Sequence, residues 1–200
     1  MYGAVQTKPF VFVYEQHDIE VVYGPSCRRG DEIRLDRCEA DGIPVVERRN
    51  GGGTVVLGPG MVITIIVGER NGTIPATAYF TTIHDAMIGL LSEVGVKGIM
   101  RSGISDCALN DRKILGSSLY LGTRPPLYYY QSSILVAPDL SLFERYLHHP
   151  PREPAYRRHR SHGDFCTSLA AEGYSLTPDV VRNFFASRLA KLLPGAKTEE

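Results

Sequence analysis

The chain has 200 residues, of which 43% are hydrophobic and 22% are charged, and its 22 basic and 22 acidic residues cancel. These values are typical of a folded protein that buries roughly 70% of the surface its unfolded chain exposes, and they exclude a disordered chain. A net charge of zero argues against a protein that coats nucleic acid or that binds membranes through many basic residues.

The sequence also predicts a cellular location. Its longest apolar run, residues 61–67, is too short to span a bilayer. The first residues contain no signal-peptide core. The cysteines show no paired spacing, and we expect free thiols in a cytoplasmic protein; they are Cys27, Cys38, Cys107 and Cys166.

Hydrophobic periodicity predicts a chain in which strands and helices alternate. The first two strands are expected to form a hairpin, and the apolar run 61–67 is expected in the centre of the sheet. Strands are predicted at residues 10–15, 20–24, 44–47, 54–57, 61–67, 98–101, 105–109, 112–121 and 128–136. Helices are predicted at residues 31–40, 84–94, 139–147, 161–171 and 177–193, the last ended by Gly195.

One segment differs in composition from the rest. Residues 145–162 are rich in arginine and histidine and contain three prolines, so a long ordered loop is expected there. No linker or repeat interrupts the chain. The sequence therefore predicts a single α+β domain over residues 1–200, with a central mixed or antiparallel sheet flanked by helices.

A glycine-rich segment is the first candidate functional element. Gly51, Gly52 and Gly53 lie between two predicted strands and follow an arginine pair that begins at Arg48. Such glycines expose backbone N–H groups to a ligand, and the arginine fork suits phosphate or carboxylate. No Gly-Lys-Ser/Thr follows and no helix opens after the loop, so it is neither a Walker A loop nor a dinucleotide fingerprint. An ordinary hairpin loop is the alternative interpretation.

Lys113 is the second candidate. It begins a strand of apolar and small residues, where a solvated lysine has little reason to lie. Strand alternation places it on one face with Leu115 and Ser117, with Arg112 and Ile114 on the other. The pattern indicates a lysine that points into a pocket and holds an anionic substrate. A lysine that keeps an edge strand from associating is the alternative.

In this order, the two elements resemble the lipoate–protein ligase family, within the wider group of biotin/lipoate ligases and octanoyltransferases. The shared features are the arginine pair with its glycines, a small residue and valine (residues 48–56), Ser-Asp-Cys at 105–107, and Lys-Ile-Leu-Gly-Ser-Ser at 113–118. The resemblance covers residues 10–140. It implies a sheet flanked by helices like the catalytic domain of biotin ligases and class II synthetases.

The resemblance also implies roles for individual residues. Lys113 would touch both the nucleotide phosphate and the lipoyl carbonyl, and would be the catalytic residue. The ATP-binding residues would be Arg48, Gly51, Gly52, Gly53, Thr54, Val55, Val56, Asp106 and Lys113. The lipoyl chain needs an apolar slot, and the residues expected around it are Val22, Val55, Ile114, Gly116 and Lys113.

The implied function is ATP-dependent activation of lipoate, or a related medium-chain acid, to acyl-AMP, followed by transfer to a lysine of a carrier protein domain. Mg²⁺ would accompany ATP. The alternatives are an ATP-independent octanoyl or lipoyl transferase that uses an acyl carrier protein as donor, and a non-catalytic subunit that binds lipoyl-adenylate. Nothing after Ala196 would form the accessory domain of the typical ligase, so a separate accessory subunit is expected beside the carrier.

Two further features carry weaker predictions. Cys107 invites comparison with thiol acyltransferases, but its position in a strand favours a small core residue. The histidines at 148, 149, 159 and 162 lack a convincing ligand spacing, so no metal site is predicted from them. The arginines of residues 145–162 either receive an acidic carrier protein or form a solvated face.

Overall fold

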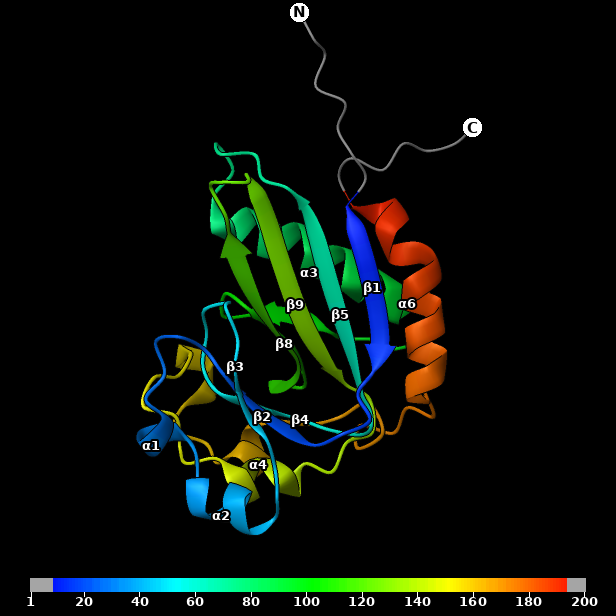
Figure 1. Cartoon of the computed structure of the whole chain (residues 1–200). Coiled ribbons are helices and arrows are strands. Elements are labelled where there is room, and N and C mark those ends of the chain that lie inside the picture. The colour runs from blue at the N-terminus through cyan, green and yellow to red at the C-terminus, as the bar shows by residue number, and fades with distance from the viewer. Residues whose placement is uncertain (1–8, 194–200) are drawn as a thin grey trace, which may run out of the picture.

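The computed structural model describes residues 9–193, in which the strands form two sheets (Figure 1). The larger sheet is antiparallel throughout, in the order β1 (Phe10–Glu15), β5 (Met61–Glu69), β9 (Leu127–Leu135), β8 (Arg112–Leu121), β7 (Asp106–Leu109) and β6 (Met100–Ser102). The smaller sheet is mixed, with β2 (Glu20–Tyr23) between the parallel β3 (Val45–Glu47) and the antiparallel β4 (Val55–Leu57).

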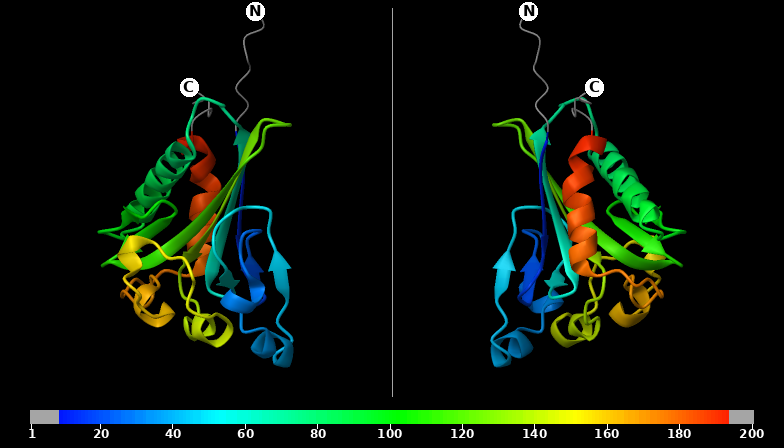
Figure 2. Two further views of the ribbon diagram at one scale, coloured as in Figure 1. Left: turned by 90° about the vertical axis from the view of Figure 1, so that its left-hand side faces the viewer. Right: turned by 90° about the vertical axis from the view of Figure 1, so that its right-hand side faces the viewer.

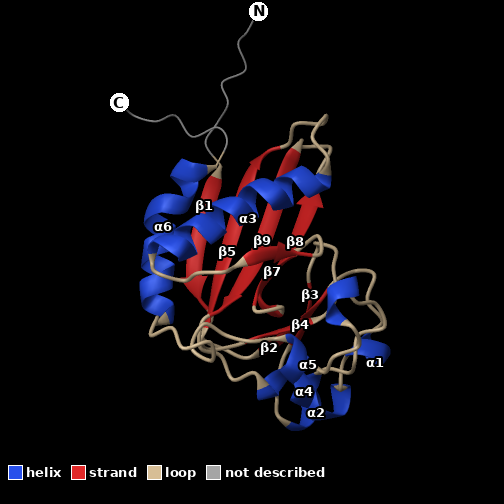
Figure 3. Cartoon of the chain, turned by 180° about the vertical axis from the view of Figure 1, so that it is seen from behind, coloured by secondary structure: helices blue, strands red, loops and turns tan. Residues whose placement is uncertain are grey.

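The helices divide between the two sheets. They are α1 (Arg29–Glu32), α2 (Leu35–Ala40), α3 (Ala76–Glu93), α4 (Ser141–Tyr146), α5 (His162–Phe165) and α6 (Pro178–Leu192). The two long helices, α3 and α6, cover one face of the large sheet (Figure 3). The small sheet lies on the other side of the large sheet, near one end of its strands (Figure 2). This arrangement confirms the predicted α+β class with a sheet flanked by helices.

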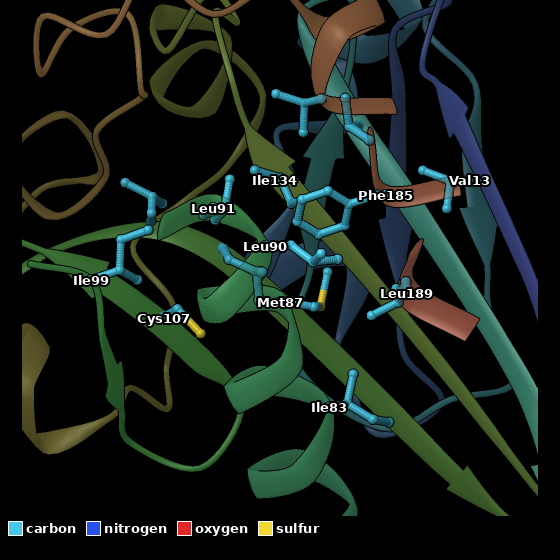
Figure 4. Packing of buried hydrophobic residues seen from close by; sticks show 14 of the residues in the cluster. Val13, Ile83, Met87, Leu90, Leu91, Ile99, Cys107, Ile134, Phe185 and Leu189 are labelled. Atoms are coloured by element: carbon cyan, nitrogen blue, oxygen red, sulfur yellow. The ribbon is translucent and has the colours of Figure 1, made fainter. Parts of the chain in front are cut away.

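Two hydrophobic cores lie on opposite faces of the large sheet. Side chains of β5 reach both, because Val62 and Ile66 pack with α3 and α6, whereas Met61 and Ile63 pack with the small sheet and α4. Figure 4 shows the first core around Phe185 and the buried side of α3. A strand buried on both faces explains the nearly continuous apolar run in β5. The strand lies one position in from the β1 edge rather than in the centre of the sheet.

The predicted hairpin of the first two strands is wrong. β1 pairs with β5 in the large sheet, and β2 pairs with β3 and β4 in the small one. The chain crosses between the sheets just after Gln16, whose N–H donates to the carbonyl of Met61 at 3.0 Å. Two neighbouring strands of similar composition therefore pack into different hydrophobic cores.

Three predicted helices have different bounds in the structure. The helix over 31–40 is broken at Ile33, which is extended, 1% exposed and bridged to Leu147. The helix predicted from Ser161 ends at Phe165, because the next residues run beside Lys113. α3 begins well before residue 84, since packing of its aromatic and β-branched first turns outweighs their low helix propensity.

Several local signals are confirmed. Thr177 caps α6 by accepting from the N–H of Val180 at 3.3 Å, and Ser161 caps α5 by accepting from the N–H of Asp164. Asn110 and Asp111, with φ of 51° and 61°, form the predicted turn between β7 and β8. Gly195, expected to end the last helix, lies outside the described residues.

Candidate active site

A pocket of about 560 Å³ lies between the two sheets. The small sheet contributes an apolar wall that includes Val22, Val55 and Leu57. The large sheet contributes polar and small residues of β8 and β9, among them Gly116 and Ser132. The loop between α4 and α5 lines a further side. The pocket therefore joins an apolar wall to a polar one.

Lys113 and Asp106 form an ion pair in this pocket. Their Nζ and Oδ1 atoms lie 2.9 Å apart, with 23% of the lysine side chain and 8% of the aspartate side chain exposed. Burial acts to lower the pKa of Lys113, but the charge of Asp106 and its hydrogen bond outweigh this, and the pKa is raised above its usual value. Lys113 therefore carries a positive charge toward the pocket.

A bulge in β8 sets the direction of Lys113. Across from β7, Lys113 pairs with Ala108 but Leu115 pairs with Cys107, so one extra residue is inserted at Ile114. Ile114 and Leu115 are both completely buried in the core against α3 and α6. The strict alternation predicted for this strand is therefore wrong: Lys113 shares the pocket side with Gly116 rather than with Leu115.

Arg48 holds the glycine-rich loop through hydrogen bonds to its carbonyl groups. The guanidinium donates to the carbonyls of Val22 at 3.2 Å, of Gly51 at 3.1 Å and of Gly53 at 2.6 Å. Burial lowers the pKa of Arg48. The loop also lies against Gly24, where a Cβ would meet the Gly52 carbonyl oxygen at 2.5 Å. Arg48 thus lines the pocket while its donors fix the shape of the loop.

Thr54 fixes the other end of this loop. Its N–H and its hydroxyl both donate to the carboxylate of Glu32, at 3.2 and 2.7 Å. Glu32 belongs to α1 and is 8% exposed. Together with the bonds of Arg48, this contact anchors the loop on two sides and leaves Gly52 and Gly53 facing the pocket.

The structure brings most of the predicted site residues together and leaves two outside. Ile114 does not line the pocket, because its side chain points into the core on the face opposite Lys113, the face that strand alternation gives it. Gly51 is exposed outside the lining, and its carbonyl faces Arg48. The predicted residues that do line the pocket are Val22, Arg48, Gly52, Gly53, Thr54, Val55, Val56, Asp106, Lys113 and Gly116.

The loop of residues 148–161 brings groups to the pocket that the sequence did not indicate. The Tyr156 hydroxyl donates to Asp106 Oδ2 at 2.8 Å. Arg157 is 5% exposed, lies over the Phe165 ring and lines the pocket, and its Nη2 is buried without a partner among the described residues. Only the basic composition of the segment pointed to such a role.

Cys107 is a core residue. It is completely buried among the side chains that α3 and α6 cover, and burial raises its pKa to about 12. A nucleophilic cysteine requires the opposite, a lowered pKa and access to substrate. The structure therefore favours the packing role over the thiol chemistry.

A pocket with a cationic group and open glycine backbone at one end and an apolar wall along its side suits a ligand with an anionic head and an apolar tail. The fold and this pocket define a class of α+β proteins with a ligand pocket between two sheets. The chain belongs to the lipoyl protein ligase A/B catalytic domain family, whose model matches residues 2–190.

A curated relative agrees with this family. A protein of Aeropyrum pernix, provisionally named lipoate-protein ligase A, is 29% identical over 126 residues, which is 62% of this chain and 46% of that protein. The match thus spans less than half the length of the relative.

Solved structures share the fold. A bipartite lipoate protein ligase of Thermoplasma acidophilum, studied with its E2 lipoyl domain, has a TM-score of 0.79 at 21% identity over 92% of this chain and 71% of that one. A ligase structure from the same organism with bound lipoic acid has a TM-score of 0.76 at 20% identity, over 94% and 75%. A lipoate-protein ligase A bound with ATP gives 0.76 at 21%, over 94% and 74%.

Among residues 9–193, no helix combines the length and the apolar composition needed to cross a bilayer.

Proposed function

We propose that this chain activates lipoate, or a related medium-chain acid, with ATP to give acyl-AMP, and that the acyl group then passes to a lysine of a carrier protein domain. The observation that carries the proposal is the single pocket in which Lys113 and the glycine loop adjoin the wall formed by Val22 and Val55. An acyl-adenylate contains both an acyl chain and a nucleotide. It therefore needs an apolar wall for the chain beside polar groups for the phosphate. The family and the ligands named for the structural relatives support the same reaction.

No protein nucleophile is required for this reaction. The carboxylate attacks the α-phosphate and pyrophosphate leaves. The carrier lysine later attacks the carbonyl of the mixed anhydride, which forms the amide, releases AMP and gives up the proton of the amine to solvent. The protein has to position reactants and stabilise developing charge. In this proposal Lys113 exchanges its contact with Asp106 for one with the phosphate and the acyl carbonyl. The loop of Gly52 and Gly53 offers close approach to the main chain, and Arg157 adds a second cation.

Mg²⁺ is expected to arrive with the nucleotide. Magnesium keeps waters and phosphate oxygens as ligands and needs only one or two carboxylates from a protein. Asp106 lies in the pocket and fits this need, since each of its oxygens accepts one hydrogen bond, from Lys113 or from Tyr156, and keeps a free lone pair. Bound there, the ion would neutralise phosphate charge.

The partners in this proposal are two proteins. The acceptor is a lipoyl-accepting carrier, as the E2 lipoyl domain studied with the Thermoplasma ligase suggests. The second is a separate accessory subunit, supported by the description of that ligase as bipartite. Closure over an acyl-adenylate protects it from water and strengthens every charge contact in the site.

The test separates activation from transfer. Lipoate-dependent exchange of pyrophosphate into ATP measures the first step, and mass spectrometry of a purified lipoyl domain measures the second. We expect exchange by this chain alone and efficient carrier modification only with an accessory protein. Absence of exchange while lipoyl-AMP still binds in calorimetry would identify a binding subunit. Robust lipoylation by the single chain would exclude the need for a second polypeptide.

A transferase that takes an acyl group from acyl carrier protein without ATP is the other candidate. It would catalyse no pyrophosphate exchange and would modify the carrier when ATP is absent. The completely buried Cys107 gives no support to a thioester route.

A further inference from the structure

The loop between α4 and α5 contains a cluster of metal-binding side chains at its exposed rim. Glu153 lies between two histidines, with Oε2 at 3.0 Å from His149 Nε2 and Oε1 at 2.9 Å from His159 Nδ1. The potential ligand atoms of the three residues all lie within 4.8 Å of one another. The spacing of the histidines in the sequence predicts no metal site, because it does not show that Glu153 lies between two of them in the fold.

The donor set is suited to a divalent transition metal. Two imidazoles and one carboxylate form the protein ligands of many zinc sites that keep a fourth position for water. Tetrahedral zinc with bonds of about 2.0–2.1 Å separates its ligand atoms by about 3.4 Å. The two carboxylate contacts involve different oxygens of Glu153 and, at 3.0 and 2.9 Å, are shorter than this, so the side chains have to separate slightly to admit the ion. The histidines are 46% and 90% exposed, so small rotations of their side chains can complete the geometry.

The cluster is connected to the pocket through its central residue. Glu153 lines the pocket, and its Oε2 lies 3.5 Å from Nε of the buried Arg157. His149 lies before the prolines of the loop, whereas His159 follows the turn that ends at Arg157. A metal bound by both histidines would therefore fasten the two ends of the pocket-lining segment together.

We propose that His149, Glu153 and His159 form a zinc-binding site, and that the bound ion fixes residues 149–159 over the pocket. The site stands on its own geometry and does not depend on the proposed acyl chemistry. Its metal would hold the loop rather than contact the substrate, because the cluster lies at the rim and the pocket side of Glu153 already faces Arg157.

The first experiment measures zinc binding to the full chain after treatment with a chelator. Competition with a chromophoric chelator should give one equivalent of zinc per chain, and Co²⁺ should give the visible absorption of a tetrahedral site. His149→Ala, His159→Ala and Glu153→Gln should each weaken zinc binding at least about tenfold, as loss of a ligand or its support does. His148→Ala removes a neighbouring imidazole outside the cluster and should bind zinc like the wild type.

A double variant, His149→Ala with His159→Ala, keeps the result decisive. If it binds zinc as tightly as the wild type, or if His148→Ala weakens binding equally, the proposed site is overturned. Cys27 is a partly exposed thiol that also binds zinc in principle. Loss of the equivalent in Cys27→Ser, with retention in the double variant, would likewise overturn the site.

The second experiment tests whether the metal fixes the loop. Arg152 and Arg158 are exposed trypsin sites within the segment. Zinc should slow cleavage after both residues several-fold in the wild type and leave the rate in the double variant unchanged, which controls for effects on the protease. Binding of zinc without this protection would refute the fastening role while leaving catalysis by the pocket untouched.

Discussion

The side chain of Lys113 fills the space that a Cβ of Gly116 would need. A Cβ built at Gly116 would lie 2.6 Å from both Cε and Nζ of the lysine. The absence of a side chain at Gly116 therefore allows the lysine to fold back along its own strand and to reach Asp106.

Substitution Gly116→Ala tests this relationship. The clashing atoms are the far end of a flexible side chain, so we expect a stability change of less than about 1 kcal/mol. The ammonium group must move away from its present position, and pyrophosphate exchange should fall by about 10–100-fold although its charge remains. Chemical denaturation and the exchange assay measure the two effects. Normal exchange in the variant would show that the position of Nζ seen here is not the active one.

Removal of the lysine itself should have a larger effect. Lys113→Ala should lower adenylate formation by about 10²–10³-fold, the usual loss when one preorganised donor to a developing charge is removed. The Asp106 carboxylate then keeps Tyr156 as its donor, so the fold should persist at reduced stability. Circular dichroism checks the fold. Wild-type exchange by folded Lys113→Ala would refute the role of the lysine.

Cys107→Ser distinguishes the adenylate route from a thiol route. The adenylate route uses no thiol, so activity per folded molecule should remain near that of the wild type. The free energy of unfolding should drop by about 1–3 kcal/mol, because the substitution buries a hydroxyl among hydrophobic side chains. Mass spectrometry of the native protein provides the contrary outcome: an acyl-thioester on Cys107, with complete loss of activity in the variant, would favour the transferase.

His84 predicts how stability depends on pH. It is 1% exposed, its Nε2 lies 3.0 Å from Ser117 Oγ, and burial lowers its pKa to about 4. An unfolded histidine titrates near a pKa of about 6.5, so between these values only the unfolded state binds the proton. The stability that His84 contributes is therefore fully present above a pH of about 6.5 and is lost as the pH falls toward 4. The loss in the free energy of unfolding is at most about 3 kcal/mol.

The measurement is the free energy of unfolding at several pH values. His84→Gln keeps a polar group near Ser117 but does not titrate, so its stability should fall less steeply than that of the wild type in this window. Identical slopes in the two proteins would mean that His84 is protonated equally in the folded and unfolded states. His148→Ala, which removes a partly exposed imidazole, is the matched control.

The residues of the site were predictable where chemistry is encoded in consecutive positions. The glycine loop and the lysine strand carry their residue types in order, and both meet at the pocket. The direction of Leu115 was not predictable, since a one-residue bulge interrupts the alternation and depends on how β7 pairs with β8. The assignment of β1 and β2 to separate sheets likewise depends on long-range pairing that neighbouring residues do not encode.

Contacts between distant segments were also beyond local patterns. Glu32 and Thr54 are far apart in sequence, and their hydrogen bonds appear only when α1 folds against the loop. The same is true of Tyr156 and Asp106. Composition identified the basic segment as unusual, but it did not indicate that Arg157, at the end of the turn Ala155–Arg157, lines the pocket.

The carboxylate of Asp106 connects two separate parts of the molecule. Asp106 accepts from Lys113 on the sheet and from Tyr156 on the loop. When an acid that brings no metal ion, such as lipoate alone, draws the ammonium away, the Tyr156 hydroxyl remains as a donor to a carboxylate that has lost its counter-charge, and charged acceptors form the stronger hydrogen bonds. Such a ligand in the pocket should thus strengthen the hydrogen bond from Tyr156 to Asp106. This coupling is reciprocal, so a loop held by the Tyr156–Asp106 hydrogen bond must raise the affinity for the ligand by the same factor. Ligand binding and closure of the loop of residues 148–161 therefore favour each other.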